Sequence, residues 1–359
     1  MLAFFLPATA ALAALTLLPL SRHDAWWVRG LDFPRLQLFA ISLVLTALEA
    51  ALLDLSRPST WGLLSICSAC LVYQGWWILP YTRLFPVEVK PAAGSGASIR
   101  IMTANVLTPN RNADVLLSLV RENAPDLLVT LESDLWWQER LDALRPDYPF
   151  TIQCPLDNLY GMHVYSRLPL LDSRTEYLVS PGVPSMHARV QLADGRIIRV
   201  HFLHPEPPVP PESDASGERD AELVIVARSV AEAAGPVIVT GDLNDVAWSE
   251  TTRLFRKISG LLDPRVGRGM FNTFHADHWF MRWPLDHLFH SAHFRLGAIR
   301  RLPAFGSDHF PLMTTLVLSE RGRAAQEGLD ADAEDVAFAL EKARSEGVRK
   351  ADVPQPGGR

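Results

Sequence analysis

The chain is poor in cysteine and carries no excess of positive charge. Its 359 residues include 3 cysteines, and 34 Lys/Arg stand against 40 Asp/Glu, which gives a formal net charge of −6. Cys67 and Cys70 lie inside an apolar run, where a Cys-x-x-Cys spacing is typical of small residues at helix contacts rather than of a redox or metal pair. Cys154 is alone in the rest of the chain. We therefore expect no disulfide framework.

A basic excess is also missing from residues 100 to 318, which hold 21 Lys/Arg and 26 Asp/Glu. A protein that binds nucleic acid without sequence preference carries many basic residues, because these neutralise the phosphates. The composition therefore disfavours a non-specific nucleic-acid binder.

Charge is nearly absent from three apolar runs near the N-terminus. Residues 2 to 20 carry no charge, a second run extends from Leu36 to about Leu53, and a third extends from Trp61 to Tyr81. Each is close to the roughly 20 residues that cross a bilayer as a helix, so we expect three transmembrane helices within residues 1 to 85. A cleaved signal peptide is the alternative for the first run, but no basic segment precedes it.

Glu49 interrupts the second apolar run. An ionisable residue inside a membrane helix is a candidate functional group by default. Glu49 lies near the expected helix end, and we expect its carboxylate to extend to the polar interface.

Composition divides the remaining chain into three parts. Residues 86 to 98 are rich in Pro, Ala, Gly and Ser and are expected to form a flexible linker. Residues 99 to 318 alternate strand and helix patterns early and crowd strands together later, which predicts a layered α/β sandwich with mixed sheets. Residues 319 to 359 are expected to form a charged, partly disordered tail, with one amphipathic helix around Ala333 to Arg344.

Polar residues follow the apolar β-type runs. A strand expected at Ile99 to Thr103 leads to Asn105, and a strand expected at Asp126 to Leu131 leads to Glu132. A helical pattern separates these strands, so both residues are expected at the same end of the sheet, where the two parallel strands end. The later clusters are Gly241-Asp242-Leu243-Asn244-Asp245, Leu285-Asp286-His287 and Ser307-Asp308-His309. Acids, amides and histidines gathered in this way suit metal-assisted hydrolysis of a phosphoester.

Three of these positions offer ligands for a divalent cation. A cation of the magnesium type takes hard oxygen ligands, and usually one or two of them are carboxylates. Glu132 suits such a carboxylate, with Asp308 and the amide oxygen of Asn105 completing or orienting the site. For Glu132 taken alone, a solvated surface position is the alternative.

The cluster that begins at Gly241 offers groups that act on water and phosphate. Gly241 permits a sharp turn after a strand, so that Asp242 and Asn244 project into a cleft. The carboxylate can orient or deprotonate a water, and the amide can hydrogen-bond a phosphate oxygen. An ordinary turn rich in Asp and Asn is the alternative, but it does not explain the companion clusters.

Histidines complete the candidate site. Asp286 can fix the tautomer of His309 and hold it cationic when phosphate is bound. His204 begins a Pro-rich loop after a strand and can donate to a non-bridging phosphate oxygen. The other histidines on strands are expected to be structural.

The ordered series of clusters resembles the endonuclease/exonuclease/phosphatase (DNase I-like) superfamily over about residues 98 to 318. The segment from Tyr160-Gly161 to Ser166-Arg167-Leu168-Pro169 is similar to a further segment of that family. The resemblance implies a four-layer α/β sandwich with two mixed sheets, Mg²⁺ or Mn²⁺ as cofactor, and hydrolysis of phosphoric esters. One departure is Thr130, which stands where the family usually has Gln.

The resemblance also implies a role for each site residue. It makes Glu132 the principal metal ligand, with Asn105 and Asp308 close by. Asp242 and Asn244 would position or activate the nucleophile. The transition state would be stabilised by His309 with Asp286, and by His204.

A loop of aromatic and basic residues is a candidate for substrate binding. Trp279 and Trp283 could contact lipid while Arg282 binds a phosphorylated head group, and packing over the sheet is the alternative. Three membrane helices joined to such a domain resemble a membrane-anchored bacterial branch of the superfamily, of the teicoplanin-resistance type. We expect a membrane-anchored phosphoesterase or pyrophosphatase acting on a phosphorylated lipid or small phosphoester. A membrane-tethered nuclease and a non-catalytic binding module are the alternatives.

Two arguments disagree about the side of the cell membrane on which the domain lies. The positive-inside rule places it in the cytoplasm, because basic residues collect on the domain side, namely Arg22, Arg29, Arg35, Arg83 and Lys90, against Arg57 on the other. The resemblance favours an exported domain, since a lipid carrier recycled at the outer leaflet would need it there. We expect a multi-pass protein with the domain outside, and the cytoplasm is the alternative.

Overall fold

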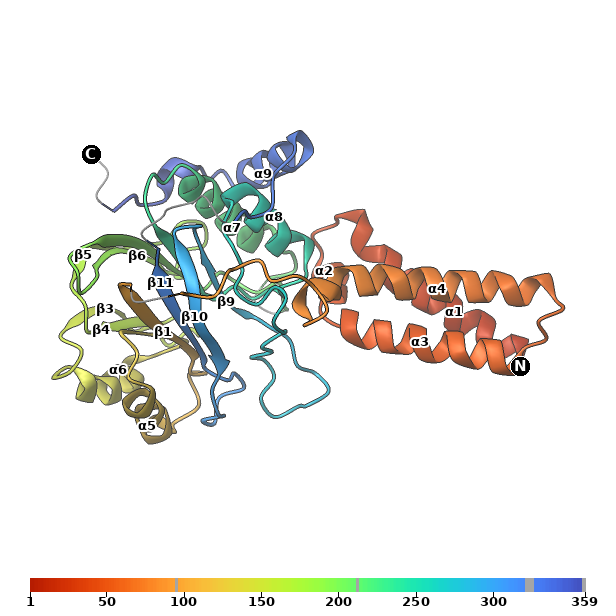
Figure 1. Ribbon diagram of the computed structural model, residues 1–359, viewed down its shortest axis with the longest axis horizontal. Helices are drawn as coiled ribbons and strands as arrows, with labels where there is room; N and C mark the ends of the chain where they lie inside the picture. Colours follow the sequence, from red (N-terminus) through yellow and green to blue (C-terminus); the bar gives the residue numbers. More distant parts are fainter. Residues whose placement is uncertain (94–95, 211–212, 320–325, 357–359) are drawn as a thin grey trace.

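The computed structural model describes residues 1 to 93, 96 to 210, 213 to 319 and 326 to 356. A bundle of long helices stands beside an α/β domain (Figure 1). The bundle consists of α1 (Leu2–Leu17), α3 (Arg35–Leu52) and α4 (Pro58–Ile78). Within the described residues, three helical stretches are long and apolar enough to cross a membrane, with mean hydropathies of 1.9, 1.6 and 1.5. The three apolar helices expected from the sequence are thus confirmed.

Two mixed sheets form the centre of the domain. One sheet has the strand order β10-β11-β1-β2-β4-β3, and the other has the order β5-β6-β7-β8-β9. The strands of the first are β10 (Phe294–Arg301), β11 (Leu312–Leu318), β1 (Ser98–Asn105), β2 (Leu127–Leu131), β4 (Met162–Ser166) and β3 (Phe150–Cys154). The strands of the second are β5 (Leu170–Glu176), β6 (Ser185–Gln191), β7 (Ile197–Leu203), β8 (Val237–Asp242) and β9 (Asp286–His290).

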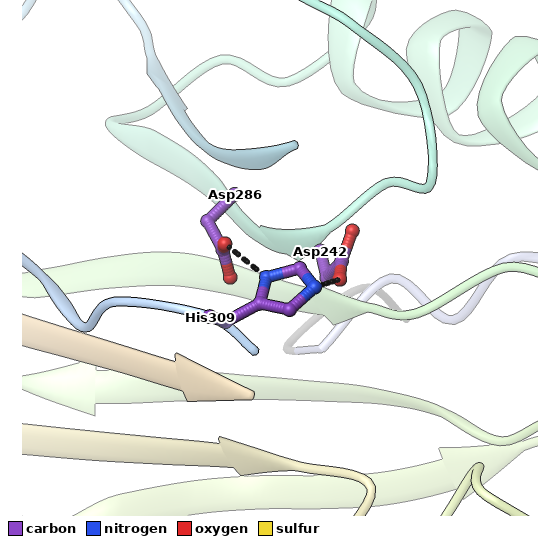
Figure 2. Close-up of side chains that lie close together, drawn as sticks. All are labelled: Asp242, Asp286 and His309. Atoms are coloured by element: carbon purple, nitrogen blue, oxygen red, sulfur yellow. Dashed lines mark hydrogen bonds and ion pairs between the residues drawn. The ribbon is translucent and has the colours of Figure 1, made fainter. Parts of the chain in front are cut away.

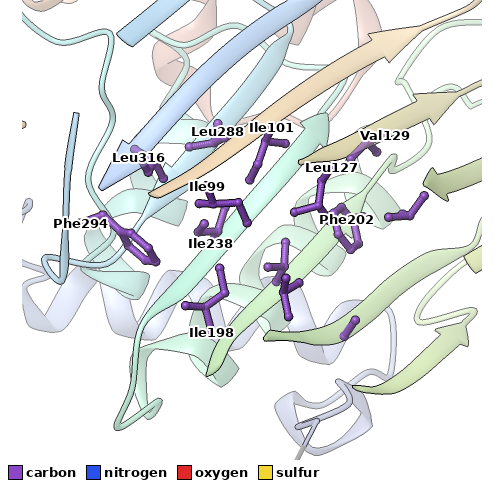
Figure 3. Close-up of a cluster of buried hydrophobic side chains, with 14 of the residues drawn as sticks. Ile99, Ile101, Leu127, Val129, Ile198, Phe202, Ile238, Leu288, Phe294 and Leu316 are labelled. Carbon is purple, nitrogen blue, oxygen red and sulfur yellow. The ribbon is translucent and has the colours of Figure 1, made fainter. Parts of the chain in front are cut away.

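The main apolar core lies between the two sheets (Figure 3). Alternate residues of a strand face opposite sides, so Ile238 packs into this core while Val237 and Val239 pack under the helices. The outer face of the first sheet is covered by α5 (Ala113–Asn123) and α6 (Leu135–Leu141). The second is covered by α7 (Gly217–Ala231), α8 (Glu250–Ser259) and α9 (Ala333–Ser345). The expected four-layer α/β sandwich is confirmed.

Strand register brings the polar clusters to one end of the sandwich. Parallel pairing of β1 with β2 sets Asn105 opposite Leu131, immediately before Glu132. Antiparallel pairing of β8 with β9 sets Asp242 opposite Asp286. The two sheets are joined just below by a 3.0 Å hydrogen bond between Thr103 Oγ1 on β1 and Thr240 Oγ1 on β8.

The bundle is attached directly to the domain. The short helix α2 (Trp26–Arg29) and the turn that follows it lie against the domain (Figure 1). Trp248 Nε1 donates to Asp32 O at 2.9 Å, and Arg29 forms an ion pair with Glu250 at 3.3 Å. An apolar cluster combines residues of both parts, namely Ile78, Tyr81, Val246, Ala247, Trp248, Val266 and Leu285. The helices and the domain therefore form one packed unit.

The segment expected to be a flexible linker is held against the domain over its described first part. Glu88 forms an ion pair with Arg256 and accepts a hydrogen bond from Asp263 N at 2.8 Å. Val89 is fully buried. Pro91 forms a bridge with Leu296 of β10. A Pro/Ala/Gly composition indicates a flexible backbone only where no other part of the protein binds that backbone.

One further expectation is wrong and one is confirmed. Glu49 is buried within the bundle and accepts a 2.6 Å hydrogen bond from Thr9, so the expectation that it extends to the interface is wrong. The helix expected around Ala333 to Arg344 is present as α9, and it packs on α7 through Ala339 and Ala343.

Candidate active site

Glu132 follows β2 in a left-handed backbone conformation, with φ 56°. Thr108 Oγ1 donates to Glu132 O at 2.7 Å, and Val106 N donates to Leu131 O at 2.9 Å. These bonds hold the turn. A non-glycine residue at positive φ is uncommon, and such strain persists where the surroundings impose it.

Asn105 joins the two sheets at the centre of the site. Its Nδ2 donates to Glu132 Oε1 at 2.7 Å and to Asp242 Oδ2 at 3.2 Å. Its Oδ1 accepts from Leu107 N at 3.0 Å. The amide group therefore orients two carboxylates, and its oxygen, which the sequence suggested for the metal, is bound by backbone.

The turn after β8 needs glycine at one position. Gly241 has φ 151°, and a Cβ there would lie 1.8 Å from Leu203 O. Asn244 N donates to Asp242 Oδ1 at 2.9 Å, and Asn244 Nδ2 donates to Pro205 O at 2.9 Å. In this arrangement Asn244 fixes the Asp242 carboxylate and the loop that begins at His204.

His309 lies between two carboxylates (Figure 2). Its Nδ1 is 2.8 Å from Asp286 Oδ2, and its Nε2 is 3.5 Å from Asp242 Oδ2. Burial alone would lower the pKa of His309, but the two carboxylates outweigh burial and raise that pKa to about 10. Burial would raise the pKa of Asp242, but His309 and His204 hold it below its ordinary value. The trio is thus an imidazolium between two carboxylates.

Glu132 and His204 are buried beside this trio and have shifted pKa values. Burial raises the pKa of Glu132 to about 7, against the hydrogen bond from Asn105 and the charge of His309. Burial lowers the pKa of His204 to about 4, so its ring is neutral at pH 7. The His204 ring lies 5.5 Å from that of Tyr160, centroid to centroid.

Two sets of residues could hold a divalent cation. Within the described residues, ligand atoms of Asp242, Asp286 and His309 all lie within 4.8 Å of one another. An imidazolium has no free lone pair for a metal, however. Glu132 fits better, because it is a hard oxygen donor whose buried Oε2 has no hydrogen-bond partner within the described chain. Asp308, which is half-buried, lies close enough for its charge to act on the carboxyl of Glu132.

The three residues expected to bind substrate lie in one loop beside this centre, here called the aromatic loop (residues 274 to 283). Ala276 N donates to Asp308 O at 2.6 Å. Arg282 donates to Ala276 O at 2.9 Å and lies over the Phe310 ring. Trp279 is 79% exposed, whereas Trp283 packs against Phe33 and Phe274. The structure therefore separates Trp279 at the surface from Trp283 inside.

Sequence reasoning missed two residues that contact the site. Phe274 has its ring centroid 5.0 Å from that of His309. Arg219 is buried in α7, donates to Asn244 O at 2.9 Å and lies 3.6 Å from Asp245. In the sequence, an Arg-Asp pair at the start of a helix is typical of a solvent-exposed position. Nothing therefore distinguished Arg219 from an exposed surface residue. For Phe274, the sequence offered no feature that indicates a site residue, apart from its position shortly before Asp286 in the chain.

Similar solved structures have the same fold. D. rerio TDP2 complexed with single strand DNA product is 16% identical, covering 61% of this chain and 98% of that one, with a TM-score of 0.50. The human Nocturnin catalytic domain with bound sulfate is 17% identical, covering 63% and 97%, with a TM-score of 0.51. An endonuclease/exonuclease/phosphatase family protein from Bacteroides thetaiotaomicron is 18% identical, covering 63% and 100%, with a TM-score of 0.50.

Sequence comparison identifies the family. No curated protein matches the chain. The model of the endonuclease/exonuclease/phosphatase family matches residues 102 to 309. This range runs from within β1 to His309 and includes every residue of the centre described above. The chain belongs to the endonuclease/exonuclease/phosphatase family.

Proposed function

We propose that the protein is a membrane-anchored, divalent-metal-dependent phosphoric ester hydrolase that acts on a phosphorylated lipid. The observation that carries the lipid assignment is the position of the aromatic loop. Gln37 Nε2, near the start of α3, donates to Phe280 O at 2.8 Å, and the rings of Phe33 and Trp283 meet edge to face at 5.6 Å. The same loop contacts Asp308 and His309. It therefore connects the catalytic centre with the end of an apolar helix.

The exposed part of the loop suits contact with a bilayer. Trp279, Phe280 and Met281 are 79%, 55% and 38% exposed. Large exposed apolar side chains in a row mark an interaction surface, and tryptophan is favoured where one end of a ring is apolar and the other wet. A lipid substrate in the same membrane as α3 would lie beside these residues.

The chemistry follows from the positions of the side chains. His309, held cationic by Asp286, places positive charge and an N–H where a phosphoryl group gains negative charge. Asp242 is the carboxylate that orients water and accepts its proton. Asn105 orients the carboxylates of Glu132 and Asp242 by donating a hydrogen bond to each. Glu132 and Asp308 would hold Mg²⁺ or Mn²⁺, which when bound supplies Lewis-acid polarisation of phosphoryl oxygens.

A membrane-tethered nuclease is the main alternative. One of the similar structures, D. rerio TDP2, contains a single strand DNA product. The absence of a basic excess from residues 100 to 318 and the contact of the aromatic loop with α3 favour lipid.

The test uses the full-length protein in liposomes. The substrates are a polyprenyl pyrophosphate, a phosphoinositide, sphingomyelin, single-stranded DNA and duplex DNA, each with Mg²⁺, with Mn²⁺ or with excess chelator. We expect the highest kcat/KM for a lipid phosphate, and no turnover with chelator. DNA as the best substrate would establish the nuclease instead. Undiminished activity with chelator would exclude a metal-dependent mechanism. Tight binding of a substrate without turnover would indicate a binding module.

We also propose a multi-pass membrane protein with the domain outside the cytoplasm. This side suits a lipid carrier recycled at the outer leaflet, whereas the arginines near the domain favour the cytoplasm. Alkaline phosphatase and green fluorescent protein, each fused to the C-terminus, report on opposite sides of the membrane. An active phosphatase fusion and a dark fluorescent fusion are expected, and the reverse pattern would place the domain in the cytoplasm.

A further inference from the structure

A cavity lies where the helical bundle meets the domain, away from the catalytic residues. Its volume is about 570 Å³, and no residue of the catalytic centre lines it. Its lining residues come from the domain-side ends of the bundle helices and from α8 and α9. Four basic and four acidic side chains line it, together with the aromatic rings of Tyr73, Trp77 and Phe338. We call it the junction cavity.

Most charges in the junction cavity are already paired. Arg22 binds Glu250 at 2.8 Å and Glu334 at 2.9 Å, and Lys257 binds Asp335 at 2.6 Å. Arg253 differs, since within the described chain no carboxylate lies within 4.0 Å of its guanidinium, which stands 5.9 Å from the centre of the Trp77 ring. Among the described residues, Arg253 is therefore the basic residue of this wall that has no carboxylate partner.

Arg35 supplies a second donor without a partner. It is 2% exposed and binds Asp32, and its Nη1 donates to Gln74 Oε1 at 3.3 Å. Its guanidinium lies over the rings of Tyr73 and Trp77, at 5.6 and 4.6 Å. Arg35 Nε is buried and has no hydrogen-bond partner among the described residues. A buried donor left unpaired costs stability, so a ligand with acceptor oxygens in this cavity would satisfy it.

The depth of the junction cavity identifies the kind of ligand. Tyr73 and Trp77 lie in the last three turns of one apolar stretch (Pro58–Tyr81), and Pro19 and Leu20 lie at the end of another (Leu2–Ser21). Across a bilayer these residues would stand at the level of the head groups on the domain side, where tyrosine and tryptophan concentrate. Trp77 and Arg253 also line a second cavity of about 170 Å³, whose other walls include Trp76, Tyr81, Phe85 and Trp248. A polar cavity beside an aromatic one suits a molecule with a phosphate and an apolar part.

We propose that the junction cavity binds the head group of a zwitterionic phospholipid, with the phosphodiester on Arg253. The wall carries four basic and four acidic residues, so it offers no net charge to favour an anionic head group. The bound lipid would act as a structural ligand between the bundle and α8, separate from the substrate. This inference rests on the proposed membrane placement and not on the proposed catalysis.

The experiment measures retained lipid rather than activity. Full-length protein is reconstituted in nanodiscs of equal parts phosphatidylethanolamine and phosphatidylglycerol, extracted into detergent and analysed by native mass spectrometry. We expect one phosphatidylethanolamine to remain per chain. Arg253→Ala should lower its occupancy roughly tenfold, as for loss of a charge-assisted hydrogen bond, and Arg253→Lys should restore part of it. The matched control is Arg121→Ala on the exposed face of α5, which should change nothing.

Three outcomes would overturn the proposal. The first is equal retention by wild type and Arg253→Ala, and the second is preferential retention of phosphatidylglycerol. The third is stabilisation of the protein against unfolding by the soluble head group glycerophosphoethanolamine or by inorganic phosphate, without any retained lipid. That result would identify a site for a free phosphate. Hydrolysis of a soluble ester by Arg253→Ala should equal that of wild type. Failure of catalysis therefore leaves this result standing, and failure of lipid retention leaves the proposed catalysis standing.

Discussion

At the scale of single residues, the two contacts of one imidazole decide what it can do. Both ring nitrogens of His309 face carboxylates, so the ring donates and carries charge and does not accept a proton. Asp286 Oδ2 lies 2.8 Å from His309 Nδ1, and burial raises the pKa of Asp286 while the charge of His309 opposes the rise. Asp286 keeps the ring charged and in place.

Asp286→Asn should therefore lower kcat by about a hundredfold or more with little change in KM, since the lost charge matters mainly in the transition state. The measurement is steady-state kinetics on a soluble phosphodiester, with circular dichroism to confirm folding. Asp172→Asn, at an exposed position of β5, is the matched control. Activity of Asp286→Asn within threefold of wild type would exclude this role.

A second buried carboxyl affects stability rather than catalysis. Glu222 in α7 is 2% exposed, and its Oε1 has no hydrogen-bond partner among the described residues. Burial raises its pKa from 4.5 to about 8. Between these values the folded protein keeps a proton that the unfolded chain loses, so this group makes the protein less stable as the pH rises through that window.

Glu222→Met should remove this dependence, because the thioether fills similar space without a titrating group. We expect a higher Tm than wild type, with a gain at pH 8 that corresponds to a few kcal/mol and with little gain at pH 5. Thermal unfolding at both pH values measures the difference. Glu122→Met on the exposed surface of α5 should show no such dependence. A gain equal at both pH values would mean that Glu222 is not the titrating group.

At the scale of elements, the aromatic loop combines two functions that different residues serve. Trp283 packs on Phe33 and on Phe274, and Phe274 lies next to His309. Trp279 is exposed to solvent. The sequence suggested a common role for both tryptophans. The structure predicts that substitutions at the two positions have different consequences.

Trp279→Ala should reduce hydrolysis of a lipid phosphate in liposomes by about tenfold and leave hydrolysis of a soluble chromogenic ester unchanged. Trp283→Ala should reduce both, since it loosens Phe274 beside the catalytic ring. The ratio of the two activities is the measurement, with Trp136→Ala on α6 as control. Equal losses on both substrates for Trp279→Ala would contradict membrane contact by the loop.

The elements that sequence patterns predicted include the mostly buried strands whose ends carry the site. β1, β2, β8 and β9 carry apolar side chains on both faces, and their ends place Asn105, Glu132, Asp242 and Asp286 together. β3, β5, β10 and α6 were not predicted. β3, β5 and β10 are edge strands, and much of β5 and β10 is exposed, with register shifts near Asp172 and Gly297. These three strands are less buried than β9, the remaining edge strand, so their sequences show no clear alternation.

The sequence predicted those site residues whose positions are determined by the ends of strands. Its details depend on contacts between distant loops, such as Asn244 with Pro205 and Ala276 with Asp308. No local pattern encodes these. The unexpected oxygen partner of Asn105, Leu107 N, is a turn hydrogen bond two residues away, which composition alone does not reveal.

At the scale of the whole molecule, the bundle and the domain share an apolar cluster, with Ile78 and Tyr81 on one side and Val246, Trp248 and Leu285 on the other. Each of these side chains is at least nine-tenths buried. Polar contacts surround them, including the ion pair of Arg29 with Glu250.

A fragment of residues 86 to 356 should therefore be less stable than the full-length protein. Removing the bundle exposes Trp248 and Leu285, and burial of one such side chain contributes about 2 kcal/mol. We expect a Tm lower by several degrees and association at micromolar concentration, measured by scanning fluorimetry and light scattering. The milder variant Glu250→Ala in the full chain should lower the Tm in the same direction. A monomeric fragment with an unchanged Tm would show that the junction contributes no stability.

With the proposed membrane placement, the packed junction also fixes the height of the proposed catalytic centre above the bilayer. An embedded enzyme whose domain cannot swing outward reaches only the lipid molecules that diffuse laterally in its own leaflet. Its effective substrate concentration is then a mole fraction in two dimensions. Diluting the substrate with inert phospholipid at constant total amount should slow turnover in proportion, while adding further substrate vesicles that contain no enzyme should leave the rate unchanged.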